Sequence, residues 1–217
     1  MKAHHIKVSK TARYFTIGNP GPAIEKLWIC THGYGQEIEK FTSKFKDLDD
    51  GKTLIIAPEG LSRFYFGGFT GHVGASWMTK EERLHEIDDY CLYIESIYHS
   101  FIGKLVNLRQ TTLFGFSQGC PTIIRWAVRF RHDFQNLVLW AGQFAHDIDY
   151  PAVKDWLNSK RLTLVIGDQD EFLTPQRVEA YKGFLEKNNL QVDVVSFAGK
   201  HMIDRKILID LANKIQS

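Results

Sequence analysis

Residues 115–119 read Gly-Phe-Ser-Gln-Gly, a G-x-S-x-G pattern. The pattern directly follows a β-rich apolar run, residues 111–116, and directly precedes a segment of helical period that begins near Gln118. A strand-to-helix turn this sharp requires small residues two positions on either side of the serine, and it leaves the serine oxygen exposed at a helix N-terminus. The pattern predicts Ser117 as a nucleophile. The competing interpretation is an ordinary turn in which a serine caps a helix.

A serine hydroxyl is a weak nucleophile at neutral pH, so it needs a base and an acid partner that orients the base. In the fold that uses this turn, the chain order is serine, acid, histidine. His201 follows a strand-like run, residues 192–198, whereas His146 precedes the candidate acids 168 and 170 and violates that order. His132 belongs to the exit of the helix after Ser117. His201 is therefore the predicted base.

Three aspartates compete for the acid role. Asp168 and Asp170 follow the strand-like run 162–167, so they share the carboxyl edge of the sheet with His201, where α/β proteins place their ligands. Asp168 lies closest to the strand and could cap its turn. Asp204 falls in the first turn of the last expected helix, an ordinary place for an acid. Residue types and spacing leave the choice open.

An oxyanion on the substrate carbonyl would need two N–H donors. The Gln118 N–H is one, because Gln118 follows the nucleophile. Residues 31–36, Thr-His-Gly-Tyr-Gly-Gln, form a turn after an early strand, and the Tyr34 N–H is the expected second donor. His32 precedes the nucleophile in the chain and is interpreted as a structural hydrogen-bonding residue.

Apolar β-rich runs alternate with segments of helical period, which predicts an α/β protein with a mostly parallel sheet and helices on both faces. A weaker antiparallel edge is expected from residues 4–8 and 13–17. Apolar residues every three or four positions from Leu84 to Phe101 predict a long helix, and others are expected from Gln118, over 175–187 and over 202–215. The six expected strands of the sheet are 27–31, 53–57, 111–116, 137–141, 162–167 and 192–198.

Residues 58–78 are rich in glycine and aromatic side chains and follow neither period. They are expected to form a long excursion over the sheet, and long loops in compact domains are usually functional. The aromatic side chains would build an apolar wall for an acyl chain or an aromatic ester, although packing is an equally good interpretation of most of them. These predicted substrate-binding residues are Phe64, Tyr65, Phe66, Phe69 and Trp77, with Phe172 added from the segment after the candidate acids.

The 217 residues predict one domain over 1–217, and the formal net charge of +2 is spread along the chain without a basic stripe for nucleic acid. Cys30, Cys91 and Cys120 each lie in apolar segments, so buried thiols are expected rather than disulfides or metal ligands. No apolar leader or membrane-spanning run is evident, so a cytoplasmic protein without integral membrane association is the default expectation. The sequence leaves open whether the protein forms a homodimer.

Taken together, these motifs resemble the carboxylesterase and phospholipase family that includes the acyl-protein thioesterases. The resemblance implies the α/β-hydrolase fold, selects Asp170 as the acid, supports Tyr34 and Gln118 as oxyanion donors, and places Trp77 near the nucleophile. The run 171–175, Glu-Phe-Leu-Thr-Pro, departs from the family pattern after the acid. The matching pieces, in family order, are residues 32–35, Pro58, Ser76-Trp77, 115–119, 167–170 and 199–201.

The expected function is hydrolysis of a small-molecule or lipid-like carboxylic ester or thioester. Ser117, Asp170 and His201 would form the triad, with no metal or organic cofactor because backbone N–H groups stabilise the charge. A peptidase or amidase on the same fold is the alternative among enzymes, although the length leaves no room for a large cap domain. A non-catalytic binding protein is the alternative outside enzymes, and it would normally lack one triad member.

Overall fold

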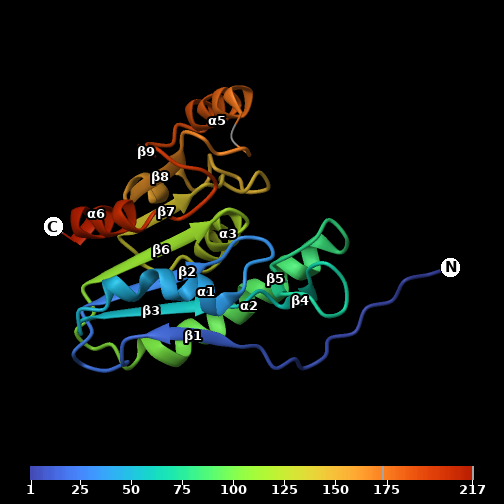
Figure 1. The fold of residues 1–217 in the computed structure, drawn as a ribbon. Helices are drawn as coiled ribbons and strands as arrows, with labels where there is room; N and C mark the ends of the chain where they lie inside the picture. Colours follow the sequence, from blue (N-terminus) through green and yellow to red (C-terminus); the bar gives the residue numbers. More distant parts are fainter. Residues whose placement is uncertain (173, 217) are drawn as a thin grey trace.

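The computed structural model describes residues 1–172 and 174–216. It contains a seven-stranded sheet in the order β1-β3-β2-β6-β7-β8-β9, with β1 antiparallel and the other strands parallel. A separate two-stranded sheet pairs β4 with β5 (Figure 1). The strands are β1 Tyr14–Ile17, β2 Lys26–Thr31, β3 Thr53–Pro58, β4 Ser62–Tyr65, β5 Val73–Ser76, β6 Gln110–Phe116, β7 Asn136–Trp140, β8 Arg161–Gly167 and β9 Asp193–Phe197.

Six predicted strands of the parallel sheet are confirmed to within one residue at either end. Their near-continuous apolar runs are explained by burial, since β3 and β7 are buried at every position and β2 and β6 at every position but the first. Strands covered by helices on both faces have no solvent side and so lose the alternating pattern. The predicted α/β class with a mostly parallel sheet is correct.

Two helical layers cover the sheet (Figure 1). Side chains of α2 and α3 pack in one apolar cluster, and those of α1, η1 and α6 pack in another. The long helices match their predicted positions, whereas α1, η1 and α4 were missed because five or six residues are too few to establish a helical period. The helices are α1 Ile38–Thr42, the 3-10 helix η1 Ser43–Leu48, α2 Arg83–Ile102, α3 Gly119–Phe130, α4 Lys154–Asn158, α5 Pro175–Lys187 and α6 Arg205–Gln216.

The predicted N-terminal pair of strands is wrong in part. Residues 4–8 form no strand, and β1 instead pairs antiparallel with β3, from Tyr14 opposite Pro58 to Ile17 opposite Ile55. The N-terminal residues extend away from the sheet (Figure 1). Ile6 and Val8 remain 88% and 77% exposed, so this segment buries no apolar face that could hold it on the sheet.

The excursion at 58–78 has more structure than the sequence suggested. Its two ends form the β4–β5 hairpin, with Ser62 opposite Ser76 and Tyr65 opposite Val73. Backbone bonds also join it to the turn after β2, because the Gly35 N–H donates to Ala75 O at 2.8 Å and the Ala75 N–H donates to Gln36 O at 3.2 Å. The segment is therefore a hairpin held against the turn that was expected to supply an oxyanion donor.

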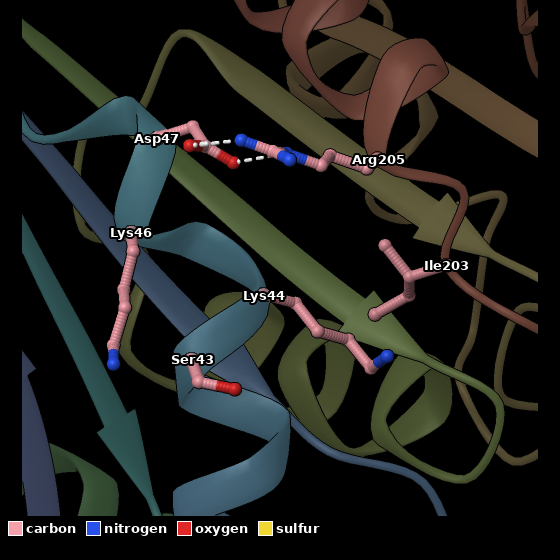
Figure 2. A pocket seen from close by; sticks show the side chains of 6 residues that line it. All are labelled: Ser43, Lys44, Lys46, Asp47, Ile203 and Arg205. Atoms are coloured by element: carbon pink, nitrogen blue, oxygen red, sulfur yellow. Dashed lines mark hydrogen bonds and ion pairs between the residues drawn. The ribbon is translucent and has the colours of Figure 1, made fainter.

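A hollow of about 390 Å³ lies between η1 and the start of α6 (Figure 2). Two hydrogen bonds cross it from the Arg205 guanidinium to the Asp47 carboxylate, at 2.6 and 2.7 Å. None of the predicted site residues is among the side chains that line it. Those six lining residues are Ser43, Lys44, Lys46, Asp47, Ile203 and Arg205.

The three cysteines are free and buried, as expected for small apolar side chains. Across residues 1–172 and 174–216, the helices include none with both the length and the apolar character needed to cross a bilayer.

Candidate active site

The turn from β6 to α3 has the geometry that the G-x-S-x-G pattern predicts. Ser117 has a positive φ of 52°, an uncommon conformation for a residue with a side chain and a sign of local strain. A Cβ at Gly115 would lie 2.6 Å from the Cys120 Cα, and one at Gly119 would lie 2.1 Å from the Thr31 carbonyl oxygen. Glycine at both positions is thus required by close packing of backbone against backbone.

Gln118 joins the turn to the hairpin segment. It is the N-cap residue of α3, and its side-chain oxygen accepts a hydrogen bond from Trp77 N at 3.2 Å. Its side-chain nitrogen donates to Met78 O at 2.9 Å. The Gln118 side chain therefore holds residues 77–78 beside the nucleophile turn, while its backbone N–H is free of these contacts.

The turn after β2 lies against the same serine. A Cβ at Gly33 would be 3.2 Å from the Ser117 Cβ, so the Gly33 backbone lies close to Ser117. The Gly33 N–H donates to Gln36 Oε1 and the Gly35 N–H to Ala75 O, both at 2.8 Å. Within the part of the chain that the structure describes, the N–H groups of Tyr34 and Gln118 donate to no protein acceptor. Both predicted oxyanion donors thus remain available to a ligand.

His32 supports this turn from beneath, as the sequence suggested. It is fully buried, its Nε2 accepts from the Gly60 N–H at 2.9 Å, and its Nδ1 lies 2.7 Å from Gly33 O. The Trp77 indole N–H donates to His32 O at 2.8 Å. A neutral imidazole with its proton on Nδ1 satisfies both ring nitrogens, and burial lowers the pKa of His32 to about 4.

We expect this buried imidazole to make the protein less stable as the pH falls from 6.5 towards 4. In that range the unfolded chain takes up a proton on residue 32 that the folded chain rejects, so about 3 kcal/mol of stability is lost, with no contribution above pH 6.5. Urea unfolding of wild type and His32→Asn at pH 7.5, 5.5 and 4.5 measures the difference. His4→Asn, on the exposed N-terminal segment, is the control. Equal pH dependence of wild type and His32→Asn would contradict the assignment.

Asp170, after the carboxyl end of β8, lies beside His201, after the carboxyl end of β9. His201 Nδ1 lies 2.8 Å from Asp170 Oδ2, and the Asp170 side chain is fully buried. The other Asp170 oxygen accepts a hydrogen bond from Phe172 N at 2.9 Å. The carboxylate therefore fixes one ring nitrogen of His201 and leaves Nε2 for chemistry.

The competing acids have other partners. Asp168 accepts a hydrogen bond from Gly199 N at 3.1 Å, which is the turn-capping role considered for it. Asp204 immediately precedes α6 rather than lying in its first turn, and it accepts from Ile207 N at 2.9 Å, as an N-cap acid does. His132 lies at the far end of α3, where its ring nitrogen contacts the Glu95 carboxylate at 2.9 Å.

Ser117 and His201 line one cleft of about 890 Å³, together with Tyr34 and Phe172. No hydrogen bond joins the Ser117 hydroxyl to His201 among the described residues. Between a serine nucleophile and its histidine this bond is often long until substrate binds. The cleft thus contains a strained serine and an oriented imidazole, and Tyr34 also lines it, while Gln118 is the next residue after the serine.

Most of the aromatic residues predicted to bind substrate do not line the cleft that contains Ser117. Of these residues, Phe172 lines the cleft, with its ring 4.7 Å from His201. Trp77 is 1% exposed and packs against His32 beneath the turn, so it does not reach the cleft surface. The hairpin side chains Phe64 and Phe66 pack against the Tyr34 ring, while Tyr65 and Phe69 are 54% and 94% exposed.

The apolar wall instead comes from the segment after β7 and from α5. Phe144, Tyr181 and Phe184 line the cleft, with ring centroids about 6.3 Å apart between Phe144 and each of the other two. Arg83, Arg125 and Arg177 also line it. The helical period of α5 could have indicated an apolar face, but nothing in the sequence says that this face meets the nucleophile.

Comparisons with known proteins identify the family and the fold. The sequence profile described as phospholipase/carboxylesterase matches residues 12–217. The search of curated proteins finds no match.

Solved structures share the fold at low sequence identity. Zea mays acyl-protein thioesterase 2 superposes with a TM-score of 0.71 at 15% identity, over 95% of this chain and 98% of that one. A carboxylesterase from Mesorhizobium loti gives 0.68 at 17% identity, over 93% and 94%. A phospholipase/carboxylesterase from Dyadobacter fermentans gives 0.64 at 18% identity, over 97% and 99%. With the profile spanning nearly every residue and the sheet and nucleophile turn arranged as described, the chain belongs to the phospholipase/carboxylesterase family of α/β-hydrolases and is an ester hydrolase by type.

Proposed function

We propose that Ser117, His201 and Asp170 form a catalytic triad that cleaves carboxylic esters or thioesters through an acyl-enzyme. The observation that carries the proposal is the 2.8 Å contact between His201 Nδ1 and a fully buried Asp170 carboxylate, at the cleft that also contains the strained Ser117. An imidazole held in this tautomer can accept a proton at Nε2, and the carboxylate stabilises the imidazolium that results.

In the proposed reaction the Ser117 oxygen attacks the carbonyl carbon while His201 Nε2 takes the hydroxyl proton. Negative charge develops on the carbonyl oxygen, where the N–H groups of Tyr34 and Gln118 would donate to it. When the intermediate collapses, His201 returns its proton to the departing alcohol or thiol. Water, deprotonated by the same imidazole, then releases the acid from Ser117. Every proton moves through side chains of this chain, so the proposal includes no cofactor.

The cleft supports small ester substrates with an apolar part. Its volume of about 890 Å³ falls in the range of small-molecule sites, and Phe144, Tyr181 and Phe184 form an apolar surface within it. Peptidase or amidase activity would use the same triad and is distinguished by comparing an ester with the corresponding amide.

Covalent labelling with a fluorophosphonate probe tests the proposal. We expect wild type to label stoichiometrically and Ser117→Ala to lose labelling, because the probe reacts with an activated serine. Intact-protein mass spectrometry measures the adduct. Ser43→Ala, which changes a serine in the hollow of Figure 2, is the matched control and should label as wild type does.

Labelling of Ser117→Ala at the wild-type rate would show that another residue is the nucleophile. A wild-type protein that never labels and hydrolyses no ester would favour the alternative of a binding protein that kept the fold.

A further inference from the structure

Three guanidinium groups line the cleft that contains Ser117. Arg83 is the first residue of α2, Arg125 lies within α3 and Arg177 is in the first turn of α5. Among the described residues, the side chains that line the cleft include no aspartate or glutamate. Cationic groups from three helices thus face a cleft whose remaining wall is mainly apolar.

Asp147 neutralises only part of this charge. Its Oδ1 lies 2.7 Å from Arg125 Nη2 and 3.1 Å from Arg83 Nη2, so one carboxylate serves two guanidinium groups. Burial raises the pKa of Asp147, but hydrogen bonds and charge from Arg125, with the charge of Arg83, outweigh burial and hold the pKa below its ordinary value. Asp147 therefore stays ionised at neutral pH, and counting Arg177 the group carries an excess of two positive charges.

Arg125 supports Arg83 through Asp147 rather than offering donors to a ligand. It is 7% exposed, its Nε and Nη2 groups donate to Asp147, and its Nη1 donates to the Tyr90 hydroxyl at 3.2 Å. The buried Arg125–Asp147 pair fixes the position of the carboxylate that holds Arg83 at the cleft.

Arg83 and Arg177 keep donors for a ligand. The Arg83 side chain is 35% exposed. Among the described residues, its polar contact is the ion pair with Asp147. Arg177 is exposed and donates one hydrogen bond, from Nη1 to Phe172 O at 2.8 Å. A guanidinium carries five N–H donors in a planar fork that matches a carboxylate or a phosphate.

We propose that the cleft contains an anion subsite formed by Arg83 and Arg177, and that the substrates are esters carrying a carboxylate or phosphate group close to the bond that is cleaved. This inference rests on the proposed ester hydrolysis and specifies its substrate class. A neutral lipid ester would offer neither guanidinium group an acceptor and would displace part of the water that solvates them, which is unfavourable. An anionic ester would place its charge where the protein has left charge unpaired.

Two matched pairs of esters test the subsite, one with the carboxylate on the acyl side of the cleaved ester bond and one with it on the alcohol side. Mono-4-nitrophenyl glutarate and 4-nitrophenyl valerate differ by a carboxylate on the acyl part. 4-Acetoxybenzoate and its methyl ester differ by a carboxylate on the alcohol part. The measured quantity is kcat/KM for the anionic ester divided by kcat/KM for its neutral partner. Intrinsic reactivity cancels when this ratio is compared between wild type and variants.

We expect Arg83→Gln and Arg177→Gln each to lower the ratio about tenfold for at least one of the pairs, since each removes charge-assisted hydrogen bonds at a partly exposed site. Rising ionic strength should lower the wild-type ratio and leave that of the double variant unchanged. Arg109→Gln is the matched control: it removes an exposed cation that pairs with Glu25 beside the start of β6, and the ratio should stay at the wild-type value.

A ratio within twofold of wild type in both single variants and the double variant, for both ester pairs, would overturn the subsite while leaving ester hydrolysis intact. If instead wild type labels with no fluorophosphonate and cleaves no ester, the failed claim is hydrolysis. Calorimetric titration of the intact protein with mono-4-nitrophenyl glutarate then tests the subsite directly. Weaker binding to the double variant would support it, and equal affinity would contradict it.

Discussion

Replacing His201 with alanine is expected to lower kcat for 4-nitrophenyl esters by about 10⁴-fold to 10⁶-fold, with a much smaller change in KM. The loss follows from the 2.8 Å contact that orients the ring from Asp170, because without the imidazole no group is positioned to take the Ser117 proton. Steady-state kinetics measure the effect, and circular dichroism checks that the variant is folded.

Two further variants test the acid partner of His201 and provide a surface control. Asp170→Asn should lower kcat by about 10⁴-fold, since an amide favours the wrong tautomer of the ring. Lys200→Ala, at the exposed neighbour of His201, should stay within about twofold of wild type, as surface changes usually do. An His201→Ala enzyme that retained a tenth of wild-type kcat would remove His201 from the proposed triad.

Gly119→Ala is expected to destabilise the protein by about 3 kcal/mol and to impair activity at the same time. The added methyl carbon would lie 2.1 Å from Thr31 O and 2.8 Å from His32 O, both of which are backbone atoms. Neither can rotate away, so the start of α3 has to separate from the end of β2. Urea unfolding monitored by tryptophan fluorescence measures the change in the free energy of unfolding.

Gly183→Ala is the matched control for this substitution. Apart from its chain neighbours and the backbone of its own helix, no described atom lies within 4 Å of the added carbon. Because Gly183 is inside α5, alanine should raise stability by about 0.5–1 kcal/mol through its better helix propensity. Unfolding of Gly119→Ala at the wild-type urea concentration would mean that the close approach of α3 to β2 is not a constraint in solution.

The parallel sheet could be predicted from sequence because a strand that is buried on both faces is a continuous apolar run, and each such run can be recognised without the others. Leu54 to Ala57, for example, are all fully buried and all apolar, so a strand of four to six residues carries its own signal. The N-terminal segment 4–8 has the same residue types in part, but whether such a segment finds an edge to pair with depends on the rest of the fold. β1 occupies the free edge of β3 instead.

The polar part of the candidate site could be anticipated because topology alone brings the carboxyl ends of β6, β8 and β9 to one edge of the sheet. Spacing did not choose between Asp168 and Asp170, since both follow the same strand. The structure adds what spacing lacks, because Asp168 faces Gly199 N while Asp170 faces His201.

The apolar wall could not be anticipated because its residues are far apart in sequence and meet only through packing. Phe144 and Phe184 lie 40 positions apart, yet their rings pack at 6.3 Å. The aromatic residues of 58–78 are close together in sequence, but the β4–β5 hairpin distributes them among buried, packed and exposed positions. Local density of aromatic residues was therefore a poor guide to the cleft.

The side chain of Gln118 connects a proposed oxyanion donor to residues 77–78, which follow the β4–β5 hairpin. Its two bonds to residues 77–78 mean that any force displacing that strand end is transmitted to the residue whose main-chain amide would meet the oxyanion. Loosening the hairpin would thus cost turnover before it cost folding, because transition-state stabilisation depends on amide placement to a fraction of an ångström. In the proposed mechanism the hairpin would therefore help to hold the Gln118 amide in place, even though its aromatic side chains lie outside the cleft.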